Sequence, residues 1–94
     1  MNSLINLALI GASGVVGKKI ISLLENKNVE INNFYPLGST SVGDEIVFNN
    51  NEYKIEDLTN FDYSKVNLAI FSAGSKVAEE HAKDFVNAGV YVID

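Results

Sequence analysis

A glycine-rich segment near the N-terminus, Gly-Ala-Ser-Gly-Val-Val-Gly at residues 11–17, limits the folds open to this chain. An apolar run precedes it and apolar residues at helical spacing follow it, so it is predicted to join a buried parallel strand at residues 5–10 to a helix. In such a junction Gly11 permits a sharp turn, Gly14 lets the backbone approach a pyrophosphate, and Gly17 lets the helix pack closely. The helix N-terminus favours an anion. We therefore predict a nucleotide-phosphate site at Gly11, Ser13, Gly14, Val15, Val16 and Gly17.

The alternative for this segment is a tight connection that binds nothing. Glycine inside a helix or strand lowers stability by up to about 1 kcal/mol, so a ligand explains three spaced glycines better than a connection alone. The helix that follows is expected to bury Val16, Ile20, Leu23 and Leu24 and to expose Lys18, Lys19, Glu25 and Lys27. Asn28 can cap it in a left-handed conformation.

The rest of the chain alternates between strand and helix patterns. A second strand is predicted at residues 34–37, where Pro36 suggests a strand end or a sheet margin. A peripheral antiparallel hairpin is predicted from residues 45–48 and 52–55, because the three asparagines between them tolerate positive φ. The apolar run at residues 66–71 stops at Ser72-Ala73-Gly74 and is expected to lie beside the first strand.

The C-terminal part predicts one more helix and one more strand. The helix spans about residues 76–88, with Ser75 as its cap and Gly89 at its end. Its inward residues are predicted to be Val77, Ala78, Ala82, Phe85 and Val86, and a strand begins at residues 90–93. The predicted fold class is α/β, a Rossmann-like doubly wound and mostly parallel sheet with a peripheral hairpin, in one domain over residues 1–94.

Composition excludes several classes of function. A net charge of −5 and a pI near 4.7 argue against a nucleic-acid interface, which needs clustered Lys and Arg. The absence of cysteine excludes a disulfide scaffold, a thiolate metal site and thiol catalysis by these residues acting alone, and we expect no metal site. Neither a membrane span nor a signal peptide is recognisable, so a cytoplasmic location is the default expectation.

The end of the second strand indicates which nucleotide is bound. A typical NAD site has Asp or Glu there to bind the ribose 2′-hydroxyl, whereas this chain has the hydroxyl residues Ser39, Thr40 and Ser41. Without a carboxylate, a 2′-phosphate is not repelled, which favours NADP over NAD. The alternative is a polar loop without a ligand.

Three other sets of residues are candidate sites. Ser72, Ala73 and Gly74 end a strand beside the glycine loop and leave space for the nicotinamide ribose, although a plain small-residue turn would look the same. His81 has no second histidine or cysteine near it in the helix, so it is expected to be exposed and solvated. A solvated surface is expected for the carboxylates Asp44, Glu45, Glu52, Glu56 and Asp57. None of these residues is assigned to catalysis.

Four segments together resemble aspartate-semialdehyde dehydrogenase: residues 11–17, the hydroxyl loop at 38–43, Ala-Ile-Phe-Ser-Ala-Gly at 69–74 and Gly-Val-Tyr-Val-Ile-Asp at 89–94. The resemblance implies the NADP-binding half of an oxidoreductase that reductively dephosphorylates β-aspartyl phosphate in amino-acid biosynthesis. It implies that Ser13 to Val16 contact the pyrophosphate, Ser39 to Ser41 the 2′-phosphate, and Ser72 to Gly74 the nicotinamide side. Many family members have an arginine in the hydroxyl loop, and this chain does not.

The family's nucleophilic cysteine, substrate-binding arginine and catalytic histidine would lie beyond the equivalent of Asp94, so residues 1–94 alone are not expected to catalyse the reaction. N-acetyl-γ-glutamyl-phosphate reductase, with a similar glycine loop, is the nearest enzymatic alternative. A non-catalytic relative that serves in binding or assembly is a third. A homo-oligomer is also expected, and an isolated cofactor domain would be expected to dimerise through its exposed sheet edge.

Overall fold

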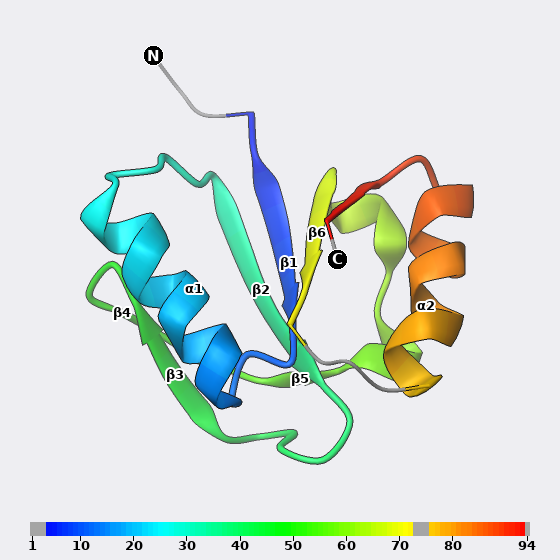
Figure 1. The fold of residues 1–94 in the computed structure, drawn as a ribbon, viewed down its shortest axis with the longest axis horizontal. Helices are drawn as coiled ribbons and strands as arrows, with labels where there is room; N and C mark the ends of the chain where they lie inside the picture. Colours follow the sequence, from blue (N-terminus) through cyan, green and yellow to red (C-terminus); the bar gives the residue numbers. More distant parts are fainter. Residues whose placement is uncertain (1–3, 73–75, 94) are drawn as a thin grey trace.

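The computed structural model of the chain describes residues 4–72 and 76–93. Its centre is a five-stranded parallel sheet with the strand order β5-β2-β1-β6-β7. The strands are β1 (Asn6–Ile10), β2 (Asn33–Gly38), β5 (Glu56–Asp57), β6 (Leu68–Phe71) and β7 (Tyr91–Ile93). The chain runs outward from β1 to β2 and β5 and then returns to β6 on the other side of β1 (Figure 1). This is the predicted doubly wound arrangement, and its direction reverses between β1 and β6.

Two layers cover the sheet (Figure 1). The helix α1 (Val15–Asn26) lies on one side together with the hairpin of β3 (Glu45–Phe48) and β4 (Asn51–Lys54), and α2 (Lys76–Asn87) lies on the other. Because side chains alternate along a strand, Leu7 and Leu9 of β1 enter the core cluster beneath α1 and the hairpin, whereas Ala8 and Ile10 enter the one beneath α2. Burial on both faces explains why β1 reads as a nearly continuous apolar run.

The hairpin forms around the asparagines as predicted. Asn49 and Asn50 have φ of 50° and 66°, the left-handed conformation that a two-residue hairpin turn requires. The hairpin stands outside the parallel sheet, and yet it contributes to the core: Ile46 and Phe48 are buried, and the Phe48 ring stacks on Phe34 with 4.5 Å between ring centroids. It occupies the connection between β2 and β5, where a helix usually joins parallel strands.

The predicted inward face of α1 is wrong in part. Val16 and Leu23 are 54% and 61% exposed, and the buried residues are Gly17 and Ile21. Ile20 and Leu24 are half-buried against the core, as predicted. The physical reason is the close approach of Gly17 to the end of β1, which turns the helix so that Gly17 and Ile21 face the sheet.

The second helix shows a similar difference. Phe85 is fully buried and Ala82 packs against the core, as predicted, but Val86 is 59% exposed. Phe85 contacts the rings of Phe61, Tyr63 and Phe71, and this aromatic cluster sets the rotation of α2. Ser75 and the side chains of Val77 and Ala78 lie outside the described residues.

The residues that end the helices behave as predicted. Asn28 has φ 53° after α1 and Gly89 has φ 84° after α2, both left-handed. Pro36 lies inside β2 and not at a strand end, paired with Leu9 of β1. The strand on the other side of β2, β5, pairs with it only at Leu37 and Gly38. No strand of the described chain therefore pairs with Pro36 on that side. A residue without an amide proton is compatible with that position.

Two aspartates cap the short 3₁₀ helices η1 (Leu58–Asn60) and η2 (Tyr63–Lys65). The Asp57 carboxylate accepts hydrogen bonds from the amide and hydroxyl of Thr59, at 2.9 and 2.7 Å, and Asp62 accepts the same pair from Ser64. These side-chain and backbone bonds lower the pKa of both carboxyls. Their ionised form therefore stabilises the folded state.

This linkage predicts acid sensitivity. The stabilisation is complete above the ordinary carboxyl pKa of about 4 and is lost as the pH falls through the lowered folded-state pKa. The double variant Asp57→Asn with Asp62→Asn should melt at a lower temperature at neutral pH and lose less of its stability in acid. Thermal unfolding followed by circular dichroism across that range tests this, with Glu52→Gln, an exposed carboxylate, as the control. Parallel pH curves for the wild type and the double variant would contradict the prediction.

Candidate functional site

The glycine loop joins β1 to α1 at the carboxyl edge of the sheet. A different physical reason favours glycine at each of its three glycine positions. Gly11 has φ 83°, which a residue with a side chain rarely adopts. A Cβ on Gly17 would lie 2.8 Å from the carbonyl oxygen of Ala12 and would also collide with that of Gly11. Gly11 and Gly17 are therefore required by the fold itself.

Gly14 differs from both, because nothing in the described chain requires it to be glycine. Its φ of −74° and ψ of 171° are open to any residue, and the nearest atom to an added Cβ is the Gly11 carbonyl oxygen at 3.4 Å, an ordinary contact. Gly14 is the N-cap of α1, yet no side chain caps the helix, and its first turn holds no acidic residue. Open space before uncapped amides at a helix N-terminus fits a pyrophosphate.

The hydroxyl loop that follows β2 lies against this glycine loop. The Ser13 and Ser41 hydroxyl oxygens are 3.1 Å apart and hydrogen-bonded, although 28 positions separate them. Ser39 and Thr40 are exposed beside them. The structure thus brings together two segments that the sequence predicted separately.

Ser72 joins the same edge from β6. Its amide donates to the Ile10 carbonyl at 2.9 Å, and its hydroxyl is 2.7 Å from that oxygen and 3.0 Å from the Gly11 oxygen. The side chain therefore ties the end of β6 to the start of the glycine loop. Ala73 and Gly74, predicted with Ser72 as part of the site, lie outside the described residues. Figure 1 shows the glycine loop and the hydroxyl loop at the edge of the sheet where the parallel strands end.

The sequence did not predict that a carboxylate lies near the end of β2. Asp57 belongs to β5, the strand next to β2, and pairs in register with Gly38 of β2. Its oxygens accept bonds from Thr59 and Asn60, so the carboxylate is engaged in capping η1. The strand β5 has only two residues, Glu56 and Asp57, which is too short to leave a hydrophobic pattern.

The expectation that His81 is exposed and solvated is wrong. Its side chain is 16% exposed, with Nδ1 3.3 Å from the Tyr63 hydroxyl and 4.0 Å from Asp84. Burial and the neighbouring Asp84 raise the pKa of Tyr63, so the phenol stays protonated. The cause is the packing of η2 against α2, which the helical position of His81 alone does not indicate.

The other carboxylates Asp44, Glu45, Glu52 and Glu56 are exposed, as expected, and Asp57 is partly buried. Across residues 4–72 and 76–93 no group of three or more His, Asp or Glu side chains could hold a metal ion. Within the same ranges, no helix has the length and apolar character needed to cross a bilayer.

Comparison with protein families gives one match that spans nearly the whole chain. The model of the semialdehyde dehydrogenase NAD-binding domain matches residues 6–94. Among solved structures, aspartate semialdehyde dehydrogenase II of Vibrio cholerae, complexed with ASA, superposes with a TM-score of 0.92 at 32% identity. That match covers 98% of this chain and 30% of the other.

Several curated proteins are similar over the same span. Aspartate-semialdehyde dehydrogenase of Legionella pneumophila is 44% identical over 95 residues, covering 100% of this chain and 27% of the relative. The Helicobacter pylori protein of the same name is 45% identical over 80 residues, 82% of this chain and 23% of its own length. The USG-1 protein homolog of Pseudomonas aeruginosa is 34% identical over 95 residues, 100% of this chain and 28% of that protein. The chain thus spans less than a third of the relatives it matches.

Proposed function

The chain belongs to the semialdehyde dehydrogenase NAD-binding domain family, and from this premise we propose that it is the NADP-binding part of an aspartate-semialdehyde dehydrogenase. The whole enzyme would reductively dephosphorylate β-aspartyl phosphate to aspartate semialdehyde in the biosynthesis of lysine, threonine and methionine. Similarity over the full chain to proteins of that name supports this activity. The part of the reaction assigned to these residues is cofactor binding.

The observation that carries the proposal is the geometry at Gly14. A glycine that the described chain does not require lies in front of an uncapped helix N-terminus, as a bound pyrophosphate would demand. Gly11 and Gly17 shape this loop, and the amides and side chains of Ser13, Val15 and Val16 border it. When bound, the cofactor would exchange a hydride with substrate, and these residues would hold it in place.

The hydroxyl loop is proposed to bind the adenosine 2′-phosphate. Ser39, Thr40 and Ser41 supply hydroxyl donors, and the Ser13 contact holds Ser41 beside the phosphate loop. Asp57, which pairs in register with Gly38, is engaged with Thr59 and Asn60. Ser72 would sit on the nicotinamide side, with Ala73 and Gly74.

The proposal extends to the location and the oligomeric state of the whole protein. We infer a cytoplasmic homo-oligomer. The edge strand β7, whose Tyr91 and Ile93 side chains are 71% and 46% exposed, offers apolar surface for further chain or a second subunit. A non-catalytic relative that serves in binding or assembly is the other candidate. A nucleophilic cysteine elsewhere in the full-length protein would favour the enzyme, and its absence would favour the non-catalytic relative.

Calorimetric titration of the chain with NADP and with NAD tests the cofactor. We expect both to bind and NADP to bind about tenfold more tightly, because only NADP offers the 2′-phosphate to the hydroxyl loop. No binding of either nucleotide at about millimolar concentration would contradict the cofactor function. Tighter binding of NAD would contradict the assignment of Ser39, Thr40 and Ser41. Circular dichroism of the same sample verifies that the chain is folded.

A further inference from the structure

The proposed 2′-phosphate site lacks a charge of its own. A phosphate monoester carries about −1.5 to −2 charges at neutral pH, and this chain has a net charge of −5. The hydroxyls of Ser39, Thr40 and Ser41 can donate hydrogen bonds, but they cannot neutralise the phosphate. The chain contains no arginine, and its seven basic residues are all lysines. If NADP binds as proposed above, any positive charge that these residues offer to the phosphate comes from a lysine.

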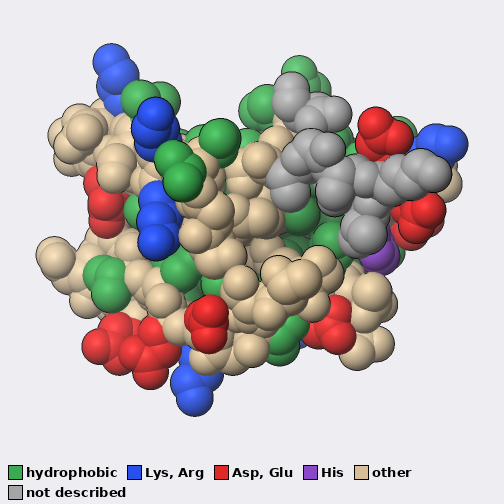
Figure 2. Space-filling view, turned by 60° about the horizontal axis from the view of Figure 1, so that its bottom comes forward, with side chains coloured by type: hydrophobic (Ala, Val, Ile, Leu, Met, Phe, Trp, Pro, Cys, Tyr) green, Lys and Arg blue, Asp and Glu red, His purple; other side chains and the backbone are tan. Residues whose placement is uncertain are grey.

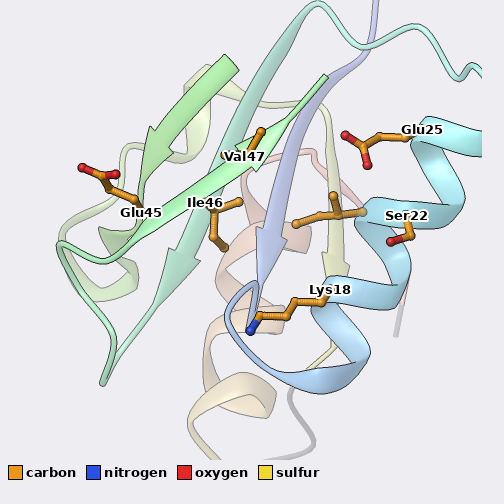
Figure 3. A pocket seen from close by; sticks show the side chains of 7 residues that line it. Lys18, Ser22, Glu25, Glu45, Ile46 and Val47 are labelled. Carbon is orange, nitrogen blue, oxygen red and sulfur yellow. The ribbon is translucent and has the colours of Figure 1, made fainter. Parts of the chain in front are cut away.

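Lys18 lies at the start of α1, directly after the glycine loop that the hydroxyl loop contacts. It follows Gly17 directly, in the first turn of α1, and its amide donates to the Gly14 carbonyl oxygen at 3.0 Å. Its side chain lines a groove of about 310 Å³ between α1 and β3, whose floor includes Ile21 and Ile46. Figure 3 shows the Lys18 ammonium extending from α1 toward the side on which the hairpin lies.

One wall of that groove is β3, which begins at Glu45, four positions after Ser41 of the hydroxyl loop. Glu25 and Glu45 line the groove together with Lys18. The hydrogen bond between Ser13 and Ser41 holds the loop against the residues that precede α1. In the described part of the chain Lys18 makes no ion pair, so its charge is available. Figure 2, which brings this edge of the sheet forward, shows lysine side chains along the half occupied by α1.

Most of the other lysines are engaged or lie elsewhere. Lys65 stands over the Tyr35 ring, 6.0 Å from its centroid, on the α2 side of the sheet. Lys54 pairs in register with Glu45 on the hairpin, and Lys83 lies on the outer surface of α2. Lys27 follows the far end of α1. Lys19 is exposed beside Lys18 but does not line the groove, which makes it a matched control.

We propose that Lys18 is the residue that selects NADP, with its ammonium pairing with the 2′-phosphate that the hydroxyl loop binds. Lysine here would replace the cation that the loop itself does not provide. The ammonium on a four-carbon stem acts as a point charge and does not need the planar fork of arginine. The interaction is exposed to water, so its effect should be moderate and sensitive to salt.

The test compares Lys18→Met and Lys19→Met, which remove the same charge from adjacent positions. Calorimetry with NADP and NAD, and with adenosine 2′,5′-bisphosphate and 5′-AMP, measures the contribution of the 2′-phosphate without the rest of the cofactor. Lys18→Met is expected to weaken both 2′-phosphorylated ligands about tenfold and to leave NAD and AMP within about twofold. Lys19→Met should leave all four ligands within about twofold, and Lys18→Arg should retain the preference.

Several results would overturn the proposal. One is unchanged NADP affinity in Lys18→Met, and another is equal weakening of NADP and NAD, which would assign Lys18 to the shared pyrophosphate. A selective loss of affinity for the 2′-phosphorylated ligands in Lys54→Met or Lys76→Met, with unchanged affinity in Lys18→Met, would assign the pairing with the 2′-phosphate to that other lysine. If the wild-type chain binds neither nucleotide, the proposed function itself fails, whereas a wild type that prefers NADP without help from Lys18 rejects this inference alone.

Discussion

Replacing Gly14 with valine is expected to abolish nucleotide binding and to leave the chain folded. The backbone at Gly14 suits any residue, and an added Cβ would meet only the Gly11 oxygen at 3.4 Å, so the fold can accept the side chain. The branched methyl groups would occupy the space in front of the α1 amides, where the pyrophosphate is proposed to bind. We expect the affinity for NADP and NAD to fall together by at least about a hundredfold.

Two measurements separate this effect from a loss of structure. The midpoint of thermal unfolding should stay within a few degrees of the wild type, because no core contact changes. Calorimetry then reports the affinity of a folded protein. Gly14→Ala, with a smaller side chain, should give an intermediate loss. Retention of NADP affinity within about twofold in Gly14→Val would show that the nucleotide does not pass over this residue.

Replacing Gly17 with alanine is expected to have the opposite profile, a large loss of stability. Alanine normally stabilises a helix by up to about 1 kcal/mol relative to glycine. Here the added Cβ would collide with the carbonyl oxygens of Gly11 and Ala12, which are backbone atoms at the end of a buried strand. The helix would have to move away from the sheet, and Ile21 would lose part of its burial. We expect a destabilisation of about 3 kcal/mol.

That loss is a large part of the roughly 5 to 14 kcal/mol that a chain of this length can be expected to have. Equilibrium unfolding in urea measures it, and the midpoint should fall clearly below that of the wild type. Lys19→Ala, at an exposed position of the same helix, should change the midpoint little. An increased midpoint in Gly17→Ala would mean that helix propensity prevails and that the close approach to β1 is not tight.

One of these two glycines shows where sequence reasoning succeeds. Their spacing predicted a role for each; the close helix packing at Gly17 is confirmed, whereas the pyrophosphate contact of Gly14 stays a prediction. The sequence did not indicate how α1 is rotated, and the exposed Val16 and Leu23 were predicted to be buried. Apolar residues occur on more than one side of this helix, so periodicity alone does not identify the inner face. The contact of Gly17 with the end of β1 does.

Other features depended on segments far apart in the sequence. The hydrogen bond between Ser13 and Ser41, the pairing of Asp57 with Gly38, and the contact of His81 with Tyr63 could not be predicted, because each depends on how two separate elements pack. Lys18 was predicted as a solvent-exposed residue of the helix. Only its position in the groove beside β3 distinguishes it from Lys19.

The sequence by itself determined the order of the helices and of every strand except the two-residue β5, the left-handed ends of the helices and the glycine loop. These features are local: a buried strand needs an apolar run, and a positive φ needs glycine or asparagine, as Gly11, Asn28 and Gly89 show. The tertiary structure alone decided which face of each helix is buried and which polar side chains meet at the carboxyl edge of the sheet. The reason is that close packing of whole layers, which depends on all residues of both surfaces together, sets the rotation of a helix and the neighbours of a loop.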